Sequence, residues 1–245
     1  MKERKRKKRA TGRLTRGVES EDVPVIASVL IRRFRNRLLR WARESGRHFF
    51  WRKEGISPFA ILITETLLSR TRAESVEPVA GQMLARFPNA TTLARADPAM
   101  VEKVLYPLGL HHKRASYLIA CAKALLEVHG GEVPRQMEQL LALPYVGRYG
   151  AAAVACFAFG ERRAVIDANV SRVYQRGFSF PIPPPRLSSA DTLWDFAERL
   201  VPQQGAKEFN WAVLDLGGTI CTPRRPSCNR CPLKTLCNAY RVRKS

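Results

Sequence analysis

The chain is organised around the stretch Leu143-Pro144-Tyr145-Val146-Gly147-Arg148-Tyr149. Apolar residues recur at helical spacing on both sides of it, over residues 135–142 and 148–159. Gly160 follows the second segment and is suited to end a helix. We therefore expect two helices joined by a short turn.

Helical periodicity extends outward from this pair in both directions. Ser57-Pro58 is typical of a helix start, with a capping hydroxyl followed by proline at the first helical position. The further helices that we expect cover residues 24–44, 57–75, 78–86, 91–95, 98–106, 112–128, 167–176, 189–201 and 206–217. Convincing strands and internal repeats are both lacking, so the sequence predicts an all-α fold.

The bulk composition favours a soluble protein with a sizeable core. The chain has 245 residues, of which 45% are hydrophobic. Apolar runs stay well short of the roughly 20 residues that a membrane-spanning helix needs. The basic start lacks an apolar segment behind it and is therefore not a secretory signal. We expect an intracellular, cytoplasmic and nucleoid-associated monomer.

The charge balance predicts a polyanionic partner. The net charge is +21, and residues 1–20 hold nine Lys or Arg and two Glu, which leaves +14 in the rest of the chain. The first 20 residues thus read as a basic, disordered arm, but they do not account for the excess. An anionic membrane is the competing partner. Because we find no basic amphipathic helix at a terminus, nucleic acid is favoured.

Four of the six cysteines lie close together near the C-terminus. They form the pattern Cys221-x6-Cys228-x2-Cys231-x5-Cys237, which indicates one closed metal site rather than a disulfide framework. Thiolates suit zinc or an iron–sulfur cluster, and zinc sites usually use two C-x2-C pairs where this sequence has one. The other two, Cys121 and Cys156, are expected to be buried apolar residues.

The spacing of these cysteines resembles the cluster loop of the endonuclease III and MutY DNA glycosylases. That resemblance implies a [4Fe–4S] cofactor with a structural role, held by Cys221, Cys228, Cys231 and Cys237. Arg224 and Arg225 lie between the first two ligands. A rigid loop presenting these cations would suit a DNA phosphate, although they could equally be solvated charges.

The stretch around Gly147 resembles the helix-hairpin-helix motif L-P-G-V-G-[KR] of the same enzymes. In that motif the backbone N–H groups of the turn and of the second helix bind a phosphate, which assigns DNA contacts to Val146, Gly147 and Arg148. Tyr145 stands where the motif has its first glycine. The hairpin therefore requires that this position tolerate a Cβ.

The segment Val165-Ile166-Asp167-Ala168-Asn169-Val170 resembles the V-D-x-[HN]-[VI] segment that carries the catalytic aspartate of this superfamily. The resemblance implies that Asp167 stabilises the cationic sugar formed as the base leaves, with Asn169 beside it at the DNA. A helix-capping role alone is the alternative for Asp167.

A second carboxylate, Glu65, follows Ser57-Pro58 within an apolar helical stretch. It shares one face with Ile61, Leu62 and Leu68, where a lone carboxylate is costly unless it is used or paired. Burial would raise its pKa and prepare it to donate a proton. A salt bridge to a basic helix is the alternative. The segment resembles the S-E-V-M-L-Q-Q-T stretch of MutY, whose glutamate falls on Glu65.

The residue that follows the hairpin separates two kinds of glycosylase. Endonuclease III-type enzymes have a nucleophilic lysine at the position that Tyr149 occupies here. Without that amine no Schiff base can form there, so we expect a monofunctional hydrolase rather than a lyase.

A narrower resemblance is to the mismatch-specific thymine glycosylases, relatives of MutY that read I-L-I-T-E-x-L-L-x-R-T, G-[KR]-Y and V-D-A-N. These motifs match 61–71, 147–149 and 166–169. The resemblance implies that Tyr149 lines the base pocket, and that the substrate is double-stranded DNA with thymine or uracil opposite guanine. Tyr149 could instead be an ordinary aromatic residue at a helix start.

Two other functions stay open. MutY removes adenine opposite 8-oxoguanine and typically has a further C-terminal domain, which we do not expect here because the chain ends soon after Cys237. A non-catalytic DNA-binding iron–sulfur protein is the other alternative. Tyr145 favours it, whereas the presence of both Glu65 and Asp167 argues against it.

Either enzyme must turn its target nucleotide out of the base stack and fill the gap. Leu110, Ser69 and Arg70 are the candidates by position, with a core role as the alternative for Leu110. We expect two helical lobes with DNA in the cleft between them. One lobe would span residues 50–162, and the cluster lobe would join 21–49 to 163–245.

Overall fold

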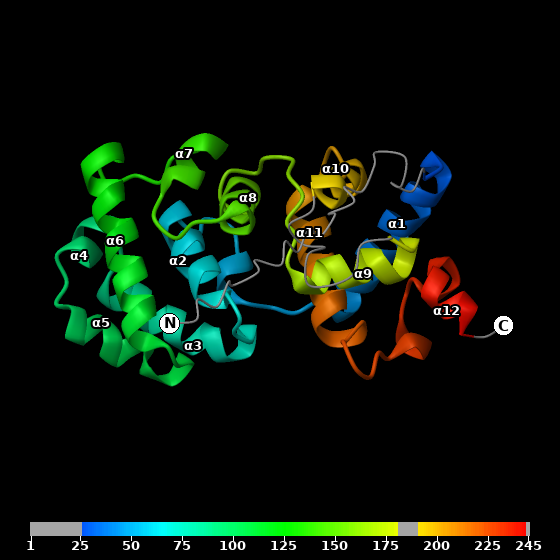
Figure 1. The fold of residues 1–245 in the computed structure, drawn as a ribbon, viewed down its shortest axis with the longest axis horizontal. Coiled ribbons are helices and arrows are strands. Elements are labelled where there is room, and N and C mark those ends of the chain that lie inside the picture. The colour runs from blue at the N-terminus through cyan, green and yellow to red at the C-terminus, as the bar shows by residue number, and fades with distance from the viewer. Residues whose placement is uncertain (1–25, 181–190, 244–245) are drawn as a thin grey trace, which may run out of the picture.

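The computed structural model describes residues 26–180 and 191–243, which form two helical lobes side by side (Figure 1). The expected basic arm, the expected helix start at Pro24 and the first residues of the helix expected at 189–201 lie outside these ranges. No strand occurs within them, so the all-α prediction is confirmed. Among these residues, no helix combines the length and apolar character needed to cross a bilayer.

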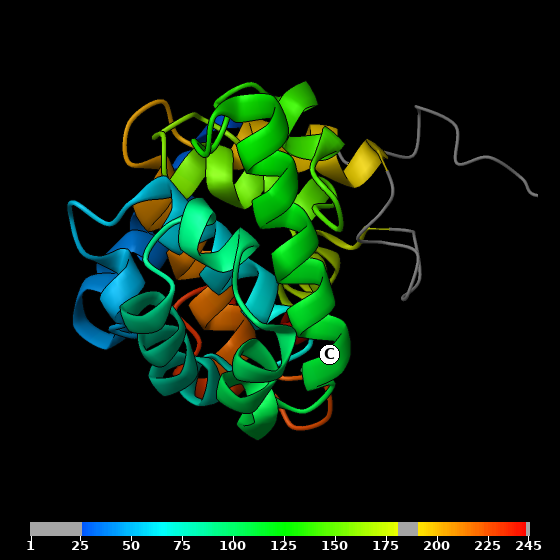
Figure 2. The same cartoon turned by 90° about the vertical axis from the view of Figure 1, so that its left-hand side faces the viewer.

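The first lobe is built from seven helices, and Figure 2 shows this lobe from its outer side. They are α2 (Pro58–Leu68), α3 (Ala73–Arg86), α4 (Ala90–Ala94), α5 (Pro98–Leu105), α6 (His111–His129), α7 (Met137–Ala142) and α8 (Arg148–Phe157), with a 3-10 turn η3 (Tyr106–Leu108) before α6. Helix α2 packs against α8, and both are buried over most of their length. They form the centre of this lobe, and both contribute residues to the site described below.

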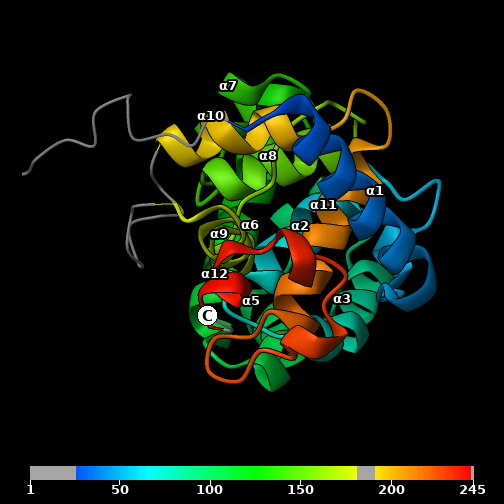
Figure 3. The same cartoon turned by 90° about the vertical axis from the view of Figure 1, so that its right-hand side faces the viewer.

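The second lobe joins the start of the described chain to its end (Figure 3). It contains α1 (Ser28–Ser45), α9 (Ala168–Phe178), α10 (Asp191–Leu200), α11 (Ala206–Asp215), the π-helical turn η5 (Leu216–Ile220), the 3-10 turns η6 (Cys228–Arg230) and η7 (Lys234–Leu236), and α12 (Asn238–Val242). Helix α1 packs against α11, and a cluster of buried aromatic rings ties α1, α9, α10 and α11 together. The 3-10 turn η2 (Phe50–Arg52) lies on the chain that passes from this lobe to the first.

One expected helix is wrong. The sequence predicted a single helix over 57–75, but the chain leaves helical geometry at Ser69 and re-enters it at Ala73. Ser69 has φ −56° and ψ 112°, Arg70 has φ 58°, and the N–H of Thr71 donates to the carbonyl of Leu68 at 3.1 Å. These are the features of a type II turn. The first part of the expected helix therefore ends at Leu68, and residues 73–75 belong to the next helix, α3.

Candidate active site

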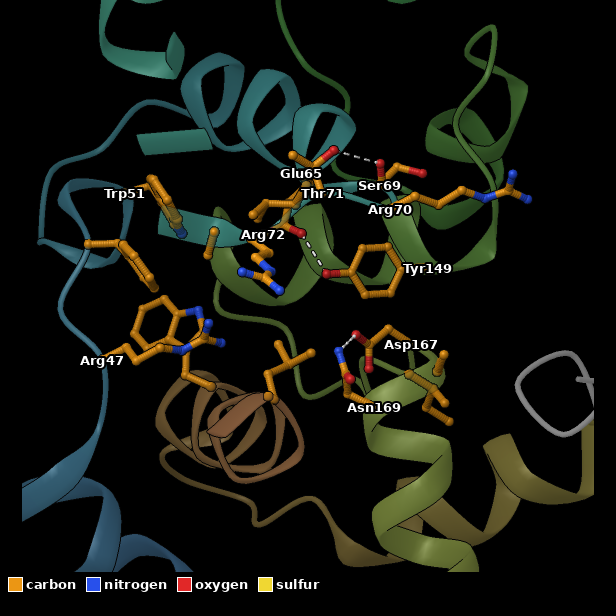
Figure 4. A pocket seen from close by; sticks show the side chains of 18 of the residues that line it. Arg47, Trp51, Glu65, Ser69, Arg70, Thr71, Arg72, Tyr149, Asp167 and Asn169 are labelled. Carbon is orange, nitrogen blue, oxygen red and sulfur yellow. Dashed lines mark hydrogen bonds between the residues drawn. The ribbon is translucent and has the colours of Figure 1, made fainter. Parts of the chain in front are cut away.

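A cleft of about 970 Å³ opens between the two lobes. Its walls come from the end of α2, residues 69–72 and the starts of α3 and α8 on one side, and from α9, α10, α11 and η5 on the other. Figure 4 shows three of the residues expected from the sequence, Glu65, Tyr149 and Asp167, gathered in this cleft. The lobes thus bring together side chains that are far apart along the chain.

Glu65 is held inside the protein by α2 and is only 5% exposed. Its Oε2 accepts a hydrogen bond of 2.8 Å from the phenol of Tyr149, at the first turn of α8. Burial raises the pKa of Glu65 to about 7, although the Tyr149 hydrogen bond and the charge of Arg52 oppose the shift. Glu65 can therefore both hold and release a proton near neutral pH. Its partner is the tyrosine rather than the expected alternative, a basic helix.

Asp167 caps α9 and also faces the cleft. Its Oδ1 accepts from the N–H of Val170 at 2.8 Å, and its Oδ2 accepts from Nδ2 of Asn169 at 2.7 Å. In Figure 4 the ring of Tyr149 lies between Asp167 and Glu65. The cap and the hydrogen bond fix the carboxylate in one orientation, so capping and a role at the cleft are compatible.

Arg172 links Asn169, and through it Asp167, to the loop that carries the cysteines. Nη2 of Arg172 donates to Oδ1 of Asn169 at 2.8 Å, and its Nε donates to the carbonyl of Cys221 at 2.7 Å. A second arginine, Arg176, lies near the sulfur of Cys221 at 3.5 Å. The geometry of Asp167 thus depends on the position of the loop that carries the cysteines.

Beside the cleft lies a cluster of charges around a buried carboxylate, which the sequence analysis missed. Asp215 on α11 accepts hydrogen bonds of 2.7–2.9 Å from Arg47 and Arg52. Burial alone would raise the pKa of Asp215, but the hydrogen bonds and charges of the two arginines outweigh it and hold the pKa below its usual value. Trp51 stacks on Phe49 beside them, with ring centroids 4.5 Å apart. The two arginines and the two aromatic rings line the cleft and give it an aromatic and cationic wall.

The hairpin accommodates Tyr145 in a left-handed conformation of the kind that favours glycine. Its φ is 63°, and the N–H of Val146 donates to the carbonyl of Leu143 at 3.2 Å, which closes a tight turn. The ring of Tyr145 is 61% exposed and stacks on Tyr117 at 3.7 Å between centroids. A side chain is therefore tolerated here because it points away from the turn.

Gly147 precedes the first turn of α8 in an extended conformation, with φ −89°. A Cβ at this position would meet no atom within 4 Å. Neither backbone conformation nor packing within the protein therefore requires glycine, and the open space leaves the first N–H groups of α8 accessible to an anion.

Arg148 points across the cleft to the second lobe. Its guanidinium lies over the ring of Trp194, 4.3 Å from the centroid, and Nη1 contacts Oδ1 of Asp191 at 2.5 Å. The structure thus places Arg148 in contact with α10, and its expected phosphate contact stays a prediction.

The three residues proposed to fill the gap in DNA are exposed. Ser69 and Arg70 line the rim of the cleft, and the side chain of Arg70 points away from the carboxylates (Figure 4). Leu110 is 64% exposed, with φ 53°, immediately before α6. The alternative of a core leucine is therefore wrong.

The four clustered cysteines line one small cavity beside α12. Within residues 26–180 and 191–243, no three His, Cys, Asp or Glu side chains are grouped closely enough to hold a single metal ion. A zinc ion would need all four sulfurs within about 2.3 Å of one point. Four thiols that line one cavity form a donor set suited to an iron–sulfur cluster or to zinc. Arg224 and Arg225 are exposed on the same loop, whereas Cys121 and Cys156 are buried as expected.

Known proteins that are similar to this chain are DNA glycosylases. The family model of HhH-GPD superfamily base excision DNA repair proteins matches residues 63–195. A thymine-DNA glycosylase of Aeropyrum pernix is 38% identical over 213 residues, which cover 86% of this chain and 95% of the relative. An adenine DNA glycosylase of Mycolicibacterium smegmatis is 38% identical over 196 residues, covering 80% of this chain and 66% of the relative.

Solved structures share the two-lobed arrangement. A thermostable thymine-DNA glycosylase superposes with a TM-score of 0.81 at 33% identity, covering 87% of this chain and 98% of that chain. A non-covalent endonuclease III–DNA complex has a TM-score of 0.75 at 22% identity, covering 90% of this chain and 99% of that one, which shows a common fold. The chain belongs to the HhH-GPD superfamily of base excision DNA repair proteins.

Proposed function

We propose that this protein is a monofunctional DNA glycosylase that removes thymine or uracil opposite guanine in double-stranded DNA. The observation that carries the proposal is the hydrogen bond of 2.8 Å between Tyr149 and Glu65, in a cleft that also contains Asp167. The Aeropyrum pernix relative is a thymine-DNA glycosylase, and the chain spans 95% of its length. The protein would act as a monomer.

In this reaction the bond between the sugar C1′ and the base nitrogen breaks, and its electron pair leaves with the base. The sugar becomes cationic, and the carboxylate of Asp167 would stabilise that charge. Water adds to C1′ and loses a proton to the solvent, which yields an abasic site. The fixed orientation of Asp167, capped onto α9 and bonded to Asn169, suits this role because it requires no rearrangement during the reaction.

Glu65 would assist the departing base. With a pKa of about 7, a substantial fraction of this side chain carries a proton near neutral pH and can donate it to the base. Tyr149 would hold the carboxyl in place and form part of the pocket wall. The aromatic wall formed by Phe49 and Trp51 would pack against the flipped base.

A lyase reaction requires an amine at the sugar. The described residues that line the cleft include no lysine, and Tyr149 occupies the position from which such an amine would act. Strand cleavage should therefore require an added base such as hot alkali.

The four cysteines would hold a [4Fe–4S] cluster through Cys221, Cys228, Cys231 and Cys237. The cluster would supply a structural cross-link between η5, η6 and α12 rather than hydrolytic chemistry. Iron and acid-labile sulfide at about four each per chain would support this assignment. Stoichiometric zinc in the protein as isolated would contradict it.

Adenine removal is the second candidate. The Mycolicibacterium smegmatis relative, an adenine DNA glycosylase, is as identical in sequence as the thymine-DNA glycosylase, and adenine needs a proton in order to leave. A carboxyl with a pKa of about 7 could provide that proton. Substrate choice must therefore be measured.

The deciding experiment is a duplex assay with G·T, G·U, G·A and 8-oxoguanine·A pairs, each with and without hot alkali. Wild type would be compared with Asp167→Asn. Cuts at thymine and uracil only after alkali, lost in Asp167→Asn, would support the proposal.

Other outcomes contradict it. Adenine release would assign the protein to the second candidate, and strand cleavage without alkali would overturn the monofunctional assignment. DNA binding without release of any base would leave the non-catalytic DNA-binding alternative.

A further inference from the structure

Arg114 is a buried arginine on α6 whose hydrogen bonds all lead to two turns of the first lobe. The residue is 8% exposed. Its Nε donates to the carbonyl of Gly109 at 3.2 Å, and its Nη1 donates to the carbonyl of Leu67 at 3.0 Å. Its Nη2 donates to the carbonyl of Ser69 at 3.2 Å and to Oγ1 of Thr71 at 2.6 Å. One rigid guanidinium thus joins residues 67–71 to residue 109.

Each of these turns carries an exposed residue in a strained conformation. Arg70 follows Ser69 with φ 58°, and Leu110 follows Gly109 with φ 53°. Left-handed geometry is costly for a residue with a Cβ. Such strain persists only where the surroundings fix it, and it is concentrated at functional sites. The guanidinium of Arg114 is that fixing element for both turns, since it bonds to the residue before each strained one.

The backbone of Arg114 also fixes Leu110. Its carbonyl accepts the N–H of Arg114 at 3.0 Å, which is the first hydrogen bond of α6. Arg114 therefore holds the Leu110 turn with both its backbone and its side chain, and it reaches the Arg70 turn with its side chain alone. The hydrogen bonds of Arg114 therefore link the two turns directly.

We propose that Arg114 is a positioning residue that fixes the Arg70 and Leu110 turns at one separation, so that both side chains enter the DNA together as the target nucleotide leaves the stack. This proposal rests on the proposed function, because it concerns how that reaction gains access to its base. A planar guanidinium with donors in a fixed fork can span the carbonyls of two turns, which a lysine ammonium cannot. Arg114 itself touches neither the base nor the sugar.

The proposed role of Arg114 concerns base flipping and not the cleavage of the glycosidic bond, so the two steps can be tested separately. A single-stranded substrate has no partner strand and no gap to fill, so it does not need the two turns. Arg114→Met should therefore lower uracil release from a G·U duplex by about 10- to 100-fold, as expected for a misplaced positioning element. Release from single-stranded DNA should stay within about twofold of wild type, since the cleft residues keep their own contacts.

A second readout does not depend on catalysis. A duplex with 2-aminopurine beside an uncleavable 2′-fluorinated target nucleotide reports base flipping by fluorescence. Arg114→Met should bind this duplex with a smaller fluorescence increase than wild type. Because wild type must show the increase even if no base is released, a failure of the proposed function remains distinguishable from a failure of this inference.

Two further variants serve as a milder change and as a control. Thr71→Val removes one of the four hydrogen bonds and should give the same pattern with a smaller amplitude, even if Arg114→Met fails to fold. Arg35→Met is the matched control, because Arg35 also bonds to backbone carbonyls, those of residues 199–201, but lies in the other lobe. It should leave both the duplex to single-strand ratio and the fluorescence unchanged.

Equal losses on duplex and single-stranded DNA would overturn the proposal, since they would indicate a general collapse of the cleft. Full fluorescence and unchanged duplex activity in both Arg114→Met and Thr71→Val would overturn it as well. Combining Arg114→Met with Leu110→Ala should lower duplex activity by less than the product of the two single effects, because both changes disable the same step.

Discussion

At the scale of single residues, the two carboxylates of the cleft differ because their surroundings differ. Glu65 lies inside α2 and shares a hydrogen bond with a phenol, so burial dominates and favours the protonated form. Asp167 sits at the N-terminus of α9, where backbone and amide donors surround its oxygens. One side chain is thus prepared to give a proton and the other to face a positive charge.

The first prediction concerns Asp167→Asn. Asparagine caps helices about as well as aspartate, so the free energy of unfolding should change by less than about 1 kcal/mol. Base release under single-turnover conditions should fall by at least about 10²–10³-fold, because the charge opposite the sugar is gone. Thermal unfolding and excision would be measured on the same preparation. Retention of most of the activity would remove Asp167 from the mechanism.

The second prediction concerns Glu65→Gln and pH. The native carboxyl keeps its proton up to about pH 7, whereas the unfolded chain releases it near pH 4.5. The folded state therefore binds more protons between these values, and stability falls as the pH rises through this window. Glutamine cannot ionise, so the variant should be more stable than wild type at pH 8, by up to about 3 kcal/mol, and nearly equal to it at pH 4.5.

Urea unfolding at pH 4.5, 6 and 8 would check this prediction. Glu138→Gln, on the exposed side of α7, is the control and should show no such pH dependence. Base release by wild type should decline above about pH 7 as Glu65 loses its proton. A stability difference between Glu65→Gln and wild type that does not change with pH would contradict the assignment.

At the scale of elements, the π-helical turn η5 has a close contact with the start of α9. A Cβ on Gly217 would lie 2.8 Å from the Cβ of Asn169 and 2.9 Å from its carbonyl oxygen. The same glycine's carbonyl accepts a hydrogen bond from Arg172 at 2.7 Å. The turn can therefore approach α9 this closely only because it has no side chain at this position.

The third prediction follows from that contact. Gly217→Ala must displace Asn169, and with it the hydrogen bond to Asp167, so we expect a loss of about 1–3 kcal/mol in stability and a clear loss of activity. Gly218→Ala is the control, because its nearest neighbour is the flexible guanidinium of Arg47 at 3.4 Å. Chemical unfolding and excision assays on both variants would check it. Equal behaviour of the two would show that the contact with Asn169 does not matter.

The elements also show what the sequence could and could not predict. Ser57-Pro58 and Gly160 marked helix boundaries that the structure keeps, because each acts through its own local geometry. The break at Ser69 was missed because the segment has no glycine or proline there. That turn is held by Arg114, a residue far away along the chain. Local patterns carry no information about such a contact.

In the site, too, local sequence signals were detected and contacts between distant residues were not. Glu65 was found because a carboxylate in an apolar helix is unusual, and Asp215, within Trp211-Ala212-Val213-Leu214-Asp215-Leu216, carries the same signal. It was overlooked because its partners Arg47 and Arg52 lie at the other end of the chain. The motifs indicated which residues come together in the cleft. They gave no information about the aromatic and charged residues that lie beside them.

At the scale of the whole molecule, the net charge of +21 raises the question of which cations contact the DNA. Arg224 and Arg225 are exposed on the cysteine loop, at the end of the molecule that carries α12 in Figure 1. The cleft with Asp167 lies between the lobes, and Arg172 connects the two regions through Asn169 and the carbonyl of Cys221. A duplex bound across the cleft and reaching this loop would place its phosphates beside the two arginines.

The fourth prediction tests that path. Replacing Arg224 and Arg225 together with alanine should weaken duplex binding and reduce the slope of log affinity against log salt by about 1–2, since each phosphate contact releases about one counterion. The excision rate with saturating enzyme should stay unchanged, because neither residue lines the cleft.

Lys103→Ala with Lys123→Ala is the control. These lysines are exposed on α5 and α6, at the opposite end of Figure 1, and the slope should not change. If the control pair lowers the slope and the arginine pair does not, the DNA must run over the first lobe, and the cysteine loop is a structural element only.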